Sequence, residues 1–253
     1  MRDKDAQRRD SAQALEFRQY VIVSDVFIVG VKRAGAVLLL CFLLNLPAPF
    51  IIAAQRTLPT SGTESVTYDG PVELTRETIL GPGQSRKEVT VDTRILLDGN
   101  EYRDSYTANR SSAFPVRDRG GLTYFFPYRP ERRSYPYSDP FSLSAVPLDY
   151  AGMGSVGGLE TYKYRAVIDD GDYHAERIFD LERRTGRVLD ETWTVAGGLA
   201  EGFFRLSEQS RVEALDAARD EVAILRVLQV LAWGTRFVAV LTLVGLAVAF
   251  ARR

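Results

Sequence analysis

Two long apolar runs, one near each end of the chain, most constrain what this sequence can fold into. The first run extends over Ala34–Ala54 and the second over Ile224–Phe250. A helix of about 20 apolar residues crosses the hydrocarbon core of a bilayer, so both runs predict transmembrane helices. For the first run, a cleavable signal peptide is the alternative. The run is long for a signal peptide, however, and Pro47 and Pro49 would bend its exit.

Basic residues indicate on which side of the membrane the two ends lie. Lys32 and Arg33 precede the first run, and two arginines at the end of the chain follow the second. Because basic residues favour the cytoplasmic side, we expect a plasma-membrane protein with both termini inside and its main domain outside. Arg236 lies within the second run, where a charge is costly, and is a candidate intramembrane contact.

The apolar runs divide the chain into six expected segments. These are a cytoplasmic tail (1–31), a first transmembrane helix (32–54), a linker or irregular edge (55–83), an extracytoplasmic β-rich domain (84–211), a connecting helix (212–223) and a second transmembrane helix (224–251). An alternative for the tail is that it is not translated, since Val31 directly before the basic pair could be another initiation site.

The polar middle of the chain has the pattern of an antiparallel sheet. Arg86–Leu97 alternates and ends at Asp98-Gly99-Asn100, a hairpin signal, and Glu101–Thr107 returns. A short strand over Leu122–Phe126 and a later meander are also expected. The meander strands are Leu159–Ile168, Tyr173–Leu181, Arg187–Val195 and Ala200–Ser207. The predicted fold class is β-rich, α+β overall, with one extracytoplasmic antiparallel sheet domain flanked by an N-terminal and a C-terminal transmembrane helix.

The stretch Tyr124–Phe141 is unusually dense in rings and contains four of the chain's 11 prolines. Proline excludes a helix or a central strand here. Arginines beside aromatic rings can bind phosphates and sugars, so this stretch is the candidate ligand or partner surface. The alternative is that the rings close one end of the domain while Arg132 and Arg133 stay solvated. The candidate residues are Tyr124, Phe126, Tyr128, Arg129, Arg132, Arg133, Tyr135, Tyr137 and Asp139.

Other motifs predict no cofactor and no metal site. The chain has one cysteine and one histidine, His174, which we expect to be a solvated or hydrogen-bonded residue at a strand end. Gly152–Gly157 matches a dinucleotide pattern but lacks the preceding strand and following helix, so it predicts a turn. Asp169–Asp172 lacks the remaining ligands of a calcium loop and predicts a hairpin turn. The net charge of −1 argues against nucleic-acid binding.

Several parts of the middle domain resemble one family of actinobacterial membrane proteins, known as the PorA family and long labelled a domain of unknown function. The residues that carry this resemblance are Gly121–Tyr128, Arg133–Pro140, Tyr150–Gly152, Val156–Tyr164 and Arg183–Val188. The resemblance implies two-span plasma-membrane proteins that face the outside of mycolate-type actinobacteria. It also implies an association of some members with lipomannan and lipoarabinomannan maturation, and it carries over no catalytic residues.

From these observations we expect a non-enzymatic accessory or binding protein of cell-envelope lipoglycan assembly. Its partners would be a membrane protein or a lipid-linked glycan. A transmembrane barrel is not expected, because two spans and a soluble β-domain do not make one. One alternative is a structural accessory subunit of a larger membrane complex. Another is an extracytoplasmic enzyme acting on envelope glycans, which would need two of the available carboxylates to face each other in a cleft.

Overall fold

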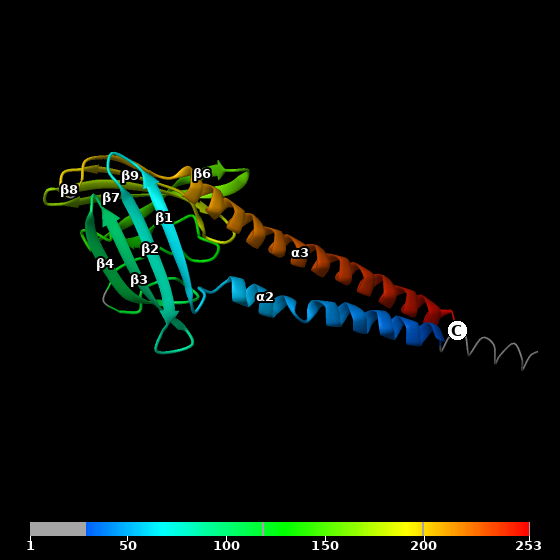
Figure 1. The fold of residues 1–253 in the computed structure, drawn as a ribbon. Coiled ribbons are helices and arrows are strands. Elements are labelled where there is room, and N and C mark those ends of the chain that lie inside the picture. Colours follow the sequence, from blue (N-terminus) through cyan, green and yellow to red (C-terminus); the bar gives the residue numbers. More distant parts are fainter. Residues whose placement is uncertain (1–28, 118, 199, 253) are drawn as a thin grey trace, which may run out of the picture. The chain divides into compact units, whose positions relative to one another are not determined.

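The computed structural model describes residues 29–117, 119–198 and 200–252 (Figure 1). Most of the predicted tail, residues 1–28, lies outside the described residues. The contacts within the chain define two compact units. One contains the described residues up to Pro49 together with Arg226 and beyond, and the other is Phe50–Leu225. Each unit is described by itself below.

Two apolar helical segments match the two predicted transmembrane runs. Residues 29–45 are helical, and α2 (Ala48–Gln55) follows after a two-residue turn at Pro47. Proline lacks the N–H that would continue the helix, which explains the interruption. The second segment is one helix, α3 (Glu208–Ala251), which unites the predicted connecting helix with the second run. By length and composition, Val29–Gln55 and α3 could each cross a membrane.

The larger unit contains a ten-stranded antiparallel sheet. Its strands are β1 (Gly62–Asp69), β2 (Leu74–Pro82), β3 (Glu88–Leu97), β4 (Asn100–Asn109), β5 (Tyr135–Ser138), β6 (Ala145–Val156), β7 (Leu159–Asp170), β8 (Tyr173–Glu182), β9 (Val188–Ala196) and β10 (Gly202–Leu206). Their order is β4-β3-β2-β1-β10-β9-β8-β7-β6-β5, so the sheet is open, with β4 and β5 at its edges. The predicted antiparallel sheet is confirmed.

Three local predictions differ from the structure. The segment 55–83, predicted as a linker or irregular edge, contains β1 and β2. These strands were not predicted because Arg76 and Thr78 occupy inward positions of β2, so the sequence lacks an apolar alternation there. Leu122–Phe126 is not a strand; only Leu122 forms an isolated parallel bridge, to Tyr137. The glycines Gly152 and Gly154 belong to β6, where Gly152 has a φ of 133° beside a β-bulge.

The sheet curves around the segment that joins β4 to β5. Within this segment, the Tyr124 ring lies 6.4 Å from that of Tyr106 on β4. Two residues further on, the Phe126 ring lies 5.1 Å from that of Phe179 on β8. Five strands separate β4 from β8 in the sheet order, so the sheet must bend for one short segment to touch both. The ring-rich stretch is therefore part of the core.

Candidate functional site

The structure divides the predicted surface residues into a buried group and an exposed group. The buried group is Tyr124, Phe126, Tyr135, Tyr137 and Asp139, none more than 6% exposed. Rings spaced two residues apart along extended backbone point to the same side, here toward the sheet. These five side chains therefore belong to the core, and their role toward a ligand or partner stays a prediction. Tyr128 is half-buried, and the three arginines of the set, Arg129, Arg132 and Arg133, are exposed.

The exposed arginines lie over neighbouring rings rather than over a cleft. The guanidinium of Arg132 lies 5.2 Å from the centre of the Tyr162 ring, and that of Arg133 lies 5.0 Å from the Tyr135 ring. Arg129 lies 5.5 Å from the Tyr128 ring. Cation–π contacts of this kind hold the side chains against the domain. Their role toward a ligand or partner stays a prediction.

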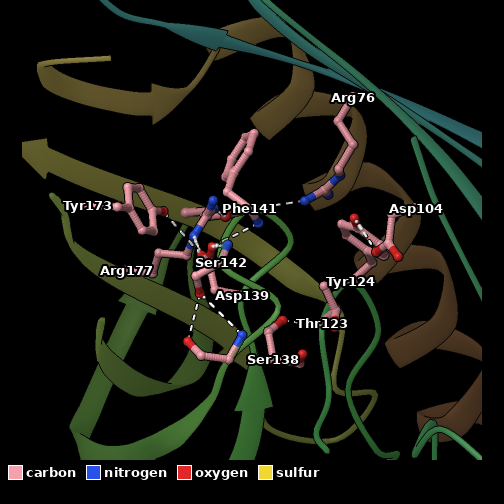
Figure 2. Close-up of polar contacts among 12 residues, drawn as sticks. Arg76, Asp104, Thr123, Tyr124, Ser138, Asp139, Phe141, Ser142, Tyr173 and Arg177 are labelled. Carbon is pink, nitrogen blue, oxygen red and sulfur yellow. Dashed lines mark hydrogen bonds and ion pairs between the residues drawn. The ribbon is translucent and has the colours of Figure 1, made fainter. Parts of the chain in front are cut away.

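Four buried charged side chains form an electrically balanced cluster, and Figure 2 labels three of them, Arg76, Asp139 and Arg177. Arg177 on β8 donates from Nε to Oδ2 of Asp139 at 2.9 Å and from Nη1 to Oε1 of Glu191 at 2.8 Å. Arg76 on β2 donates from Nη1 to Oε2 of Glu191 at 3.3 Å. Two guanidinium groups thereby balance two carboxylates at positions no more than 8% exposed. Pairing of this kind is what permits charges inside a protein core.

Hydroxyl and backbone donors satisfy the carboxylates further. The hydroxyl of Tyr68 donates to Glu191 at 2.7 Å, and burial raises the pKa of this tyrosine far above its ordinary value, so it stays protonated. The backbone N–H groups of Phe141 and Ser142 donate to Oδ1 of Asp139 at 2.9 and 3.2 Å (Figure 2). The space beside the cluster measures only about 20 Å³, room for one water at most. The cluster is therefore a structural connection between the ring-rich segment and the sheet.

A larger cavity, of about 440 Å³, lies elsewhere in the same unit. Its lining comes from β1 and β2, from the residues that follow α2, from the ring-rich segment, from the turn before β9 and from the first turns of α3. Small-molecule pockets measure roughly 300–1,000 Å³, so the cavity has the size of a ligand site. The apolar part of its wall includes Val66, Leu80 and Phe126, all buried.

Four arginines line this cavity. Arg76 belongs to the buried cluster, and Arg187 forms an ion pair with Glu221 at 2.6 Å. Arg110 donates to the backbone carbonyls of Leu58 at 2.7 Å and Arg86 at 3.2 Å. The fourth, Arg56, is exposed, and its guanidinium lies 5.4 Å from the Tyr128 ring centre. Within the described ranges, neither Arg56 nor Arg110 has a carboxylate partner.

Several buried polar atoms in the cavity wall lack a hydrogen-bond partner among the residues that the structure describes. They are Nε of Arg76, Nε of Arg187, the hydroxyl of Tyr128 and Oε1 of Gln55. An unsatisfied buried group costs about 1–3 kcal/mol, so such atoms mark places where a bound molecule would find partners. Three of the four can donate, which favours a ligand rich in acceptor atoms. Three of the predicted candidate residues, Tyr124, Phe126 and Tyr128, line this cavity. The sequence did not group the other lining residues with them, because those residues come from widely separated positions.

A polar contact joins the two apolar segments of the helical unit. Nδ2 of Asn45 donates to Oγ1 of Thr235 at 2.6 Å, and also to the Cys41 carbonyl at 2.7 Å. Asn45 lies near the middle of the first apolar run and Thr235 near the middle of the second. The two runs therefore meet near their midpoints.

Arg236, the predicted intramembrane contact, follows Thr235 directly. Consecutive residues of an α-helix point about 100° apart, so Arg236 faces away from the bond that Thr235 makes with the first segment. Its side chain is exposed, with no hydrogen bond or ion pair to any residue in the described part of the chain. The role of Arg236 as an intramembrane contact stays a prediction.

The remaining sequence candidates carry no site. His174 pairs with Asp169, Nδ1 to Oδ1 at 2.7 Å, and both side chains are exposed. No cluster of three metal-binding side chains occurs within residues 29–117, 119–198 and 200–252. Asp169 and Asp170 end β7, and the hairpin turn forms around Gly171, where φ is 62°.

Comparisons with known proteins identify the family. The family described as "Porin PorA" matches residues 52–248. A protein named Porin PorA from Corynebacterium amycolatum is 28% identical over 114 residues, which are 36% of this chain and 29% of that protein. A second Porin PorA, from Corynebacterium resistens, is 37% identical over 74 residues, 29% of this chain and 18% of that protein. The chain thus spans less than a third of either relative.

These names overturn the expected role in lipoglycan assembly. Both relatives are named porins, and neither name supports an accessory or binding protein, a structural subunit or a glycan enzyme. The expectation was wrong because the role in lipoglycan assembly came only from what the resemblance implies for some members of the family. The family itself was predicted from Gly121–Val188, within the matched residues, and is confirmed. The chain belongs to the Porin PorA family.

Proposed function

We propose that this protein forms a channel through a membrane, and that the channel is built from the apolar helices of several copies. The family name supports a channel protein rather than an enzyme. The observation that carries the proposal is the exposed Arg236 in the middle of an apolar helix. The guanidinium of Arg236 requires either a partner or water within the membrane.

The depth of Arg236 argues against snorkelling. With a rise of 1.5 Å per residue, Arg236 lies about 18 Å from Ile224 and about 21 Å from Phe250 along the helix. An arginine at the centre of a membrane helix costs at least about 2.5–3.5 kcal/mol in lipid. Such residues face the interior of a bundle or a water-filled space. A lumen lined by Arg236 would remove this cost.

A single copy cannot enclose such a lumen, because two helices that pack against each other leave no space between them. Several copies, each with Thr235 toward its own first helix and Arg236 turned about 100° away, would place a ring of arginines around a common axis. Rings of arginine favour the passage of anions. We therefore propose an oligomeric channel that prefers anions.

The topology belongs to the same proposal. The helices over 32–54 and 224–251 would cross the plasma membrane, with both termini in the cytoplasm and the β-domain outside. The basic residues Lys32, Arg33 and Arg252 beside the two runs support this orientation.

Planar-bilayer recordings of the purified full chain test the channel. With unequal KCl concentrations on the two sides, we expect discrete current steps and a reversal potential on the anion-selective side. Arg236→Gln should move the reversal potential toward zero, and Arg236→Glu should reverse its sign. The matched control is Arg226→Gln, at the edge of the same run, which should leave the reversal potential in place.

Two results would contradict the proposal. One is the absence of current steps from wild-type protein that is shown to be inserted in the bilayer. The other is a channel whose reversal potential is the same in wild type, Arg236→Gln and Arg236→Glu. The second result would place Arg236 in a protein contact outside the lumen.

A further inference from the structure

The cavity of about 440 Å³ in the β-domain is not explained by a channel made of helices. Its wall has two chemically different parts. Val66, Leu80 and Phe126 contribute apolar surface, whereas Arg76 and Arg187 each contribute an unpartnered buried Nε–H. Arg76 is only 8% exposed. A ligand that satisfies both parts has an acceptor-bearing head and an apolar tail.

The charges of the lining decide the sign of the head. Arg56 and Arg110 have no carboxylate partner in the described part of the chain, and an anionic group would gain charge-assisted hydrogen bonds from them. Glu64 and Glu213 also line the cavity and would repel a polyanion. The balance favours a head with a single negative charge.

The ends of both apolar segments contribute to the cavity wall. Gln55 is the last residue of the helical segment Val29–Gln55, and Glu221 lies three residues before the second apolar run. The cavity wall is therefore continuous along the chain with both segments that could enter a bilayer. An amphiphile is therefore favoured over a freely soluble anion.

We propose that this cavity binds a monoanionic amphiphile with one acyl chain, its carboxylate or phosphodiester on the arginines and its chain against Val66, Leu80 and Phe126. This binding is independent of the channel, so either proposal can fail without the other. Two classes of molecule have a single negative charge and one acyl chain, free fatty acids and lysophospholipids, and separate probes distinguish them.

Native mass spectrometry of the full chain, released from neutral maltoside micelles, counts bound molecules directly. The probes are oleate, oleoyl lysophosphatidylglycerol, oleyl alcohol as the neutral match, and glycerol phosphate as a head without a chain. We expect one molecule of oleate or of the lysophospholipid per chain. We also expect binding about tenfold weaker for oleyl alcohol, the loss that one charge-assisted hydrogen bond accounts for, and none for glycerol phosphate.

Two variants tie binding to this cavity. Ala214→Phe fills it from α3, and Arg56→Gln removes an exposed unpaired cation; each should weaken oleate binding by about tenfold. The controls are Val212→Phe, at an exposed position of α3, and Arg86→Gln, both outside the lining. Arg56→Gln lies at the surface and should not perturb folding, so it remains informative if Ala214→Phe unfolds.

Three outcomes would overturn the proposal. The first is equal binding of oleate and oleyl alcohol, which would mean that the head is not recognised. The second is retention of glycerol phosphate, which would mean that no chain is needed. The third is undiminished oleate binding by folded Ala214→Phe and by Arg56→Gln, which would place the ligand elsewhere on the protein.

Discussion

At the scale of single residues, the most demanding feature is charge inside the β-domain. Arg177 holds Asp139 and Glu191 at once, and burial alone would lower its pKa. The surrounding Tyr137 and the two carboxylates raise its pKa well above the ordinary value, so Arg177 stays charged. The carboxylates depend on this charge, because Arg76 reaches only Glu191. Removing Arg177 would thus leave Asp139 buried without a cation.

We expect Arg177→Met to destabilise the β-domain by about 3–5 kcal/mol, since it leaves buried carboxylates uncompensated. Urea unfolding in a Trp233→Phe background, followed by the fluorescence of buried Trp193, measures this change. The control is Arg165→Met, which removes a solvent-exposed ion pair between Arg165 on β7 and Glu176 on β8. This variant should hardly change the urea midpoint of unfolding. Similar midpoints for both variants would show that the buried cluster does not support the fold.

At the scale of elements, turns join the ring-rich segment to the sheet. Gly186, in the turn before β9, has a φ of 76°, and a Cβ at this position would lie 2.3 Å from the carbonyl oxygen of Pro127. Glycine is needed here for its left-handed backbone and also for the close approach. The backbone of the ring-rich segment therefore rests directly on this turn.

Gly186→Ala should destabilise the domain more than Gly171→Ala. Both glycines have positive φ, 76° and 62°, but no atom lies within 4 Å of a Cβ built at Gly171. Gly171→Ala is the control, and left-handed strain alone should lower its free energy of unfolding by about 1–2 kcal/mol. Gly186→Ala should lower the free energy of unfolding more, because Pro127 must also move. Urea midpoints of the two variants measure the difference. Equal losses would mean that the segment moves away from the turn at no cost.

Hairpins were predictable at this scale, and β1 and β2 were not. The pair β3–β4 follows from Asp98-Gly99, a local turn signal whose two residues both have positive φ in the structure. In β2 the inward side chains include Arg76 and Thr78, which read as solvent-facing in the sequence. Their partners lie on other strands, where Glu191 pairs with the Nη1 of Arg76 and Thr93 hydrogen-bonds to Thr78. Such partners cannot be located from local sequence.

At the scale of the whole molecule, the proposed topology makes a direct prediction. In a Cys41→Ser background, which removes the chain's one cysteine, Gly171→Cys should react with a membrane-impermeant maleimide on intact cells. Arg252→Cys should react only after the membrane is opened, because both termini are proposed to be cytoplasmic. Labelling of Arg252→Cys on intact cells, or protection of Gly171→Cys, would contradict this orientation.

The sequence by itself determined two apolar helical segments, the antiparallel character of the domain between them and the family of the chain. These properties depend on the length of apolar runs, on local turn signals and on a contiguous motif, all of which can be recognised from neighbouring residues in the sequence. Only the tertiary structure decided which rings are buried, how Arg76, Arg177, Asp139 and Glu191 combine, and where a cavity opens. Those features arise where distant segments meet, and the burial of each group depends on partners that the curved sheet brings to it.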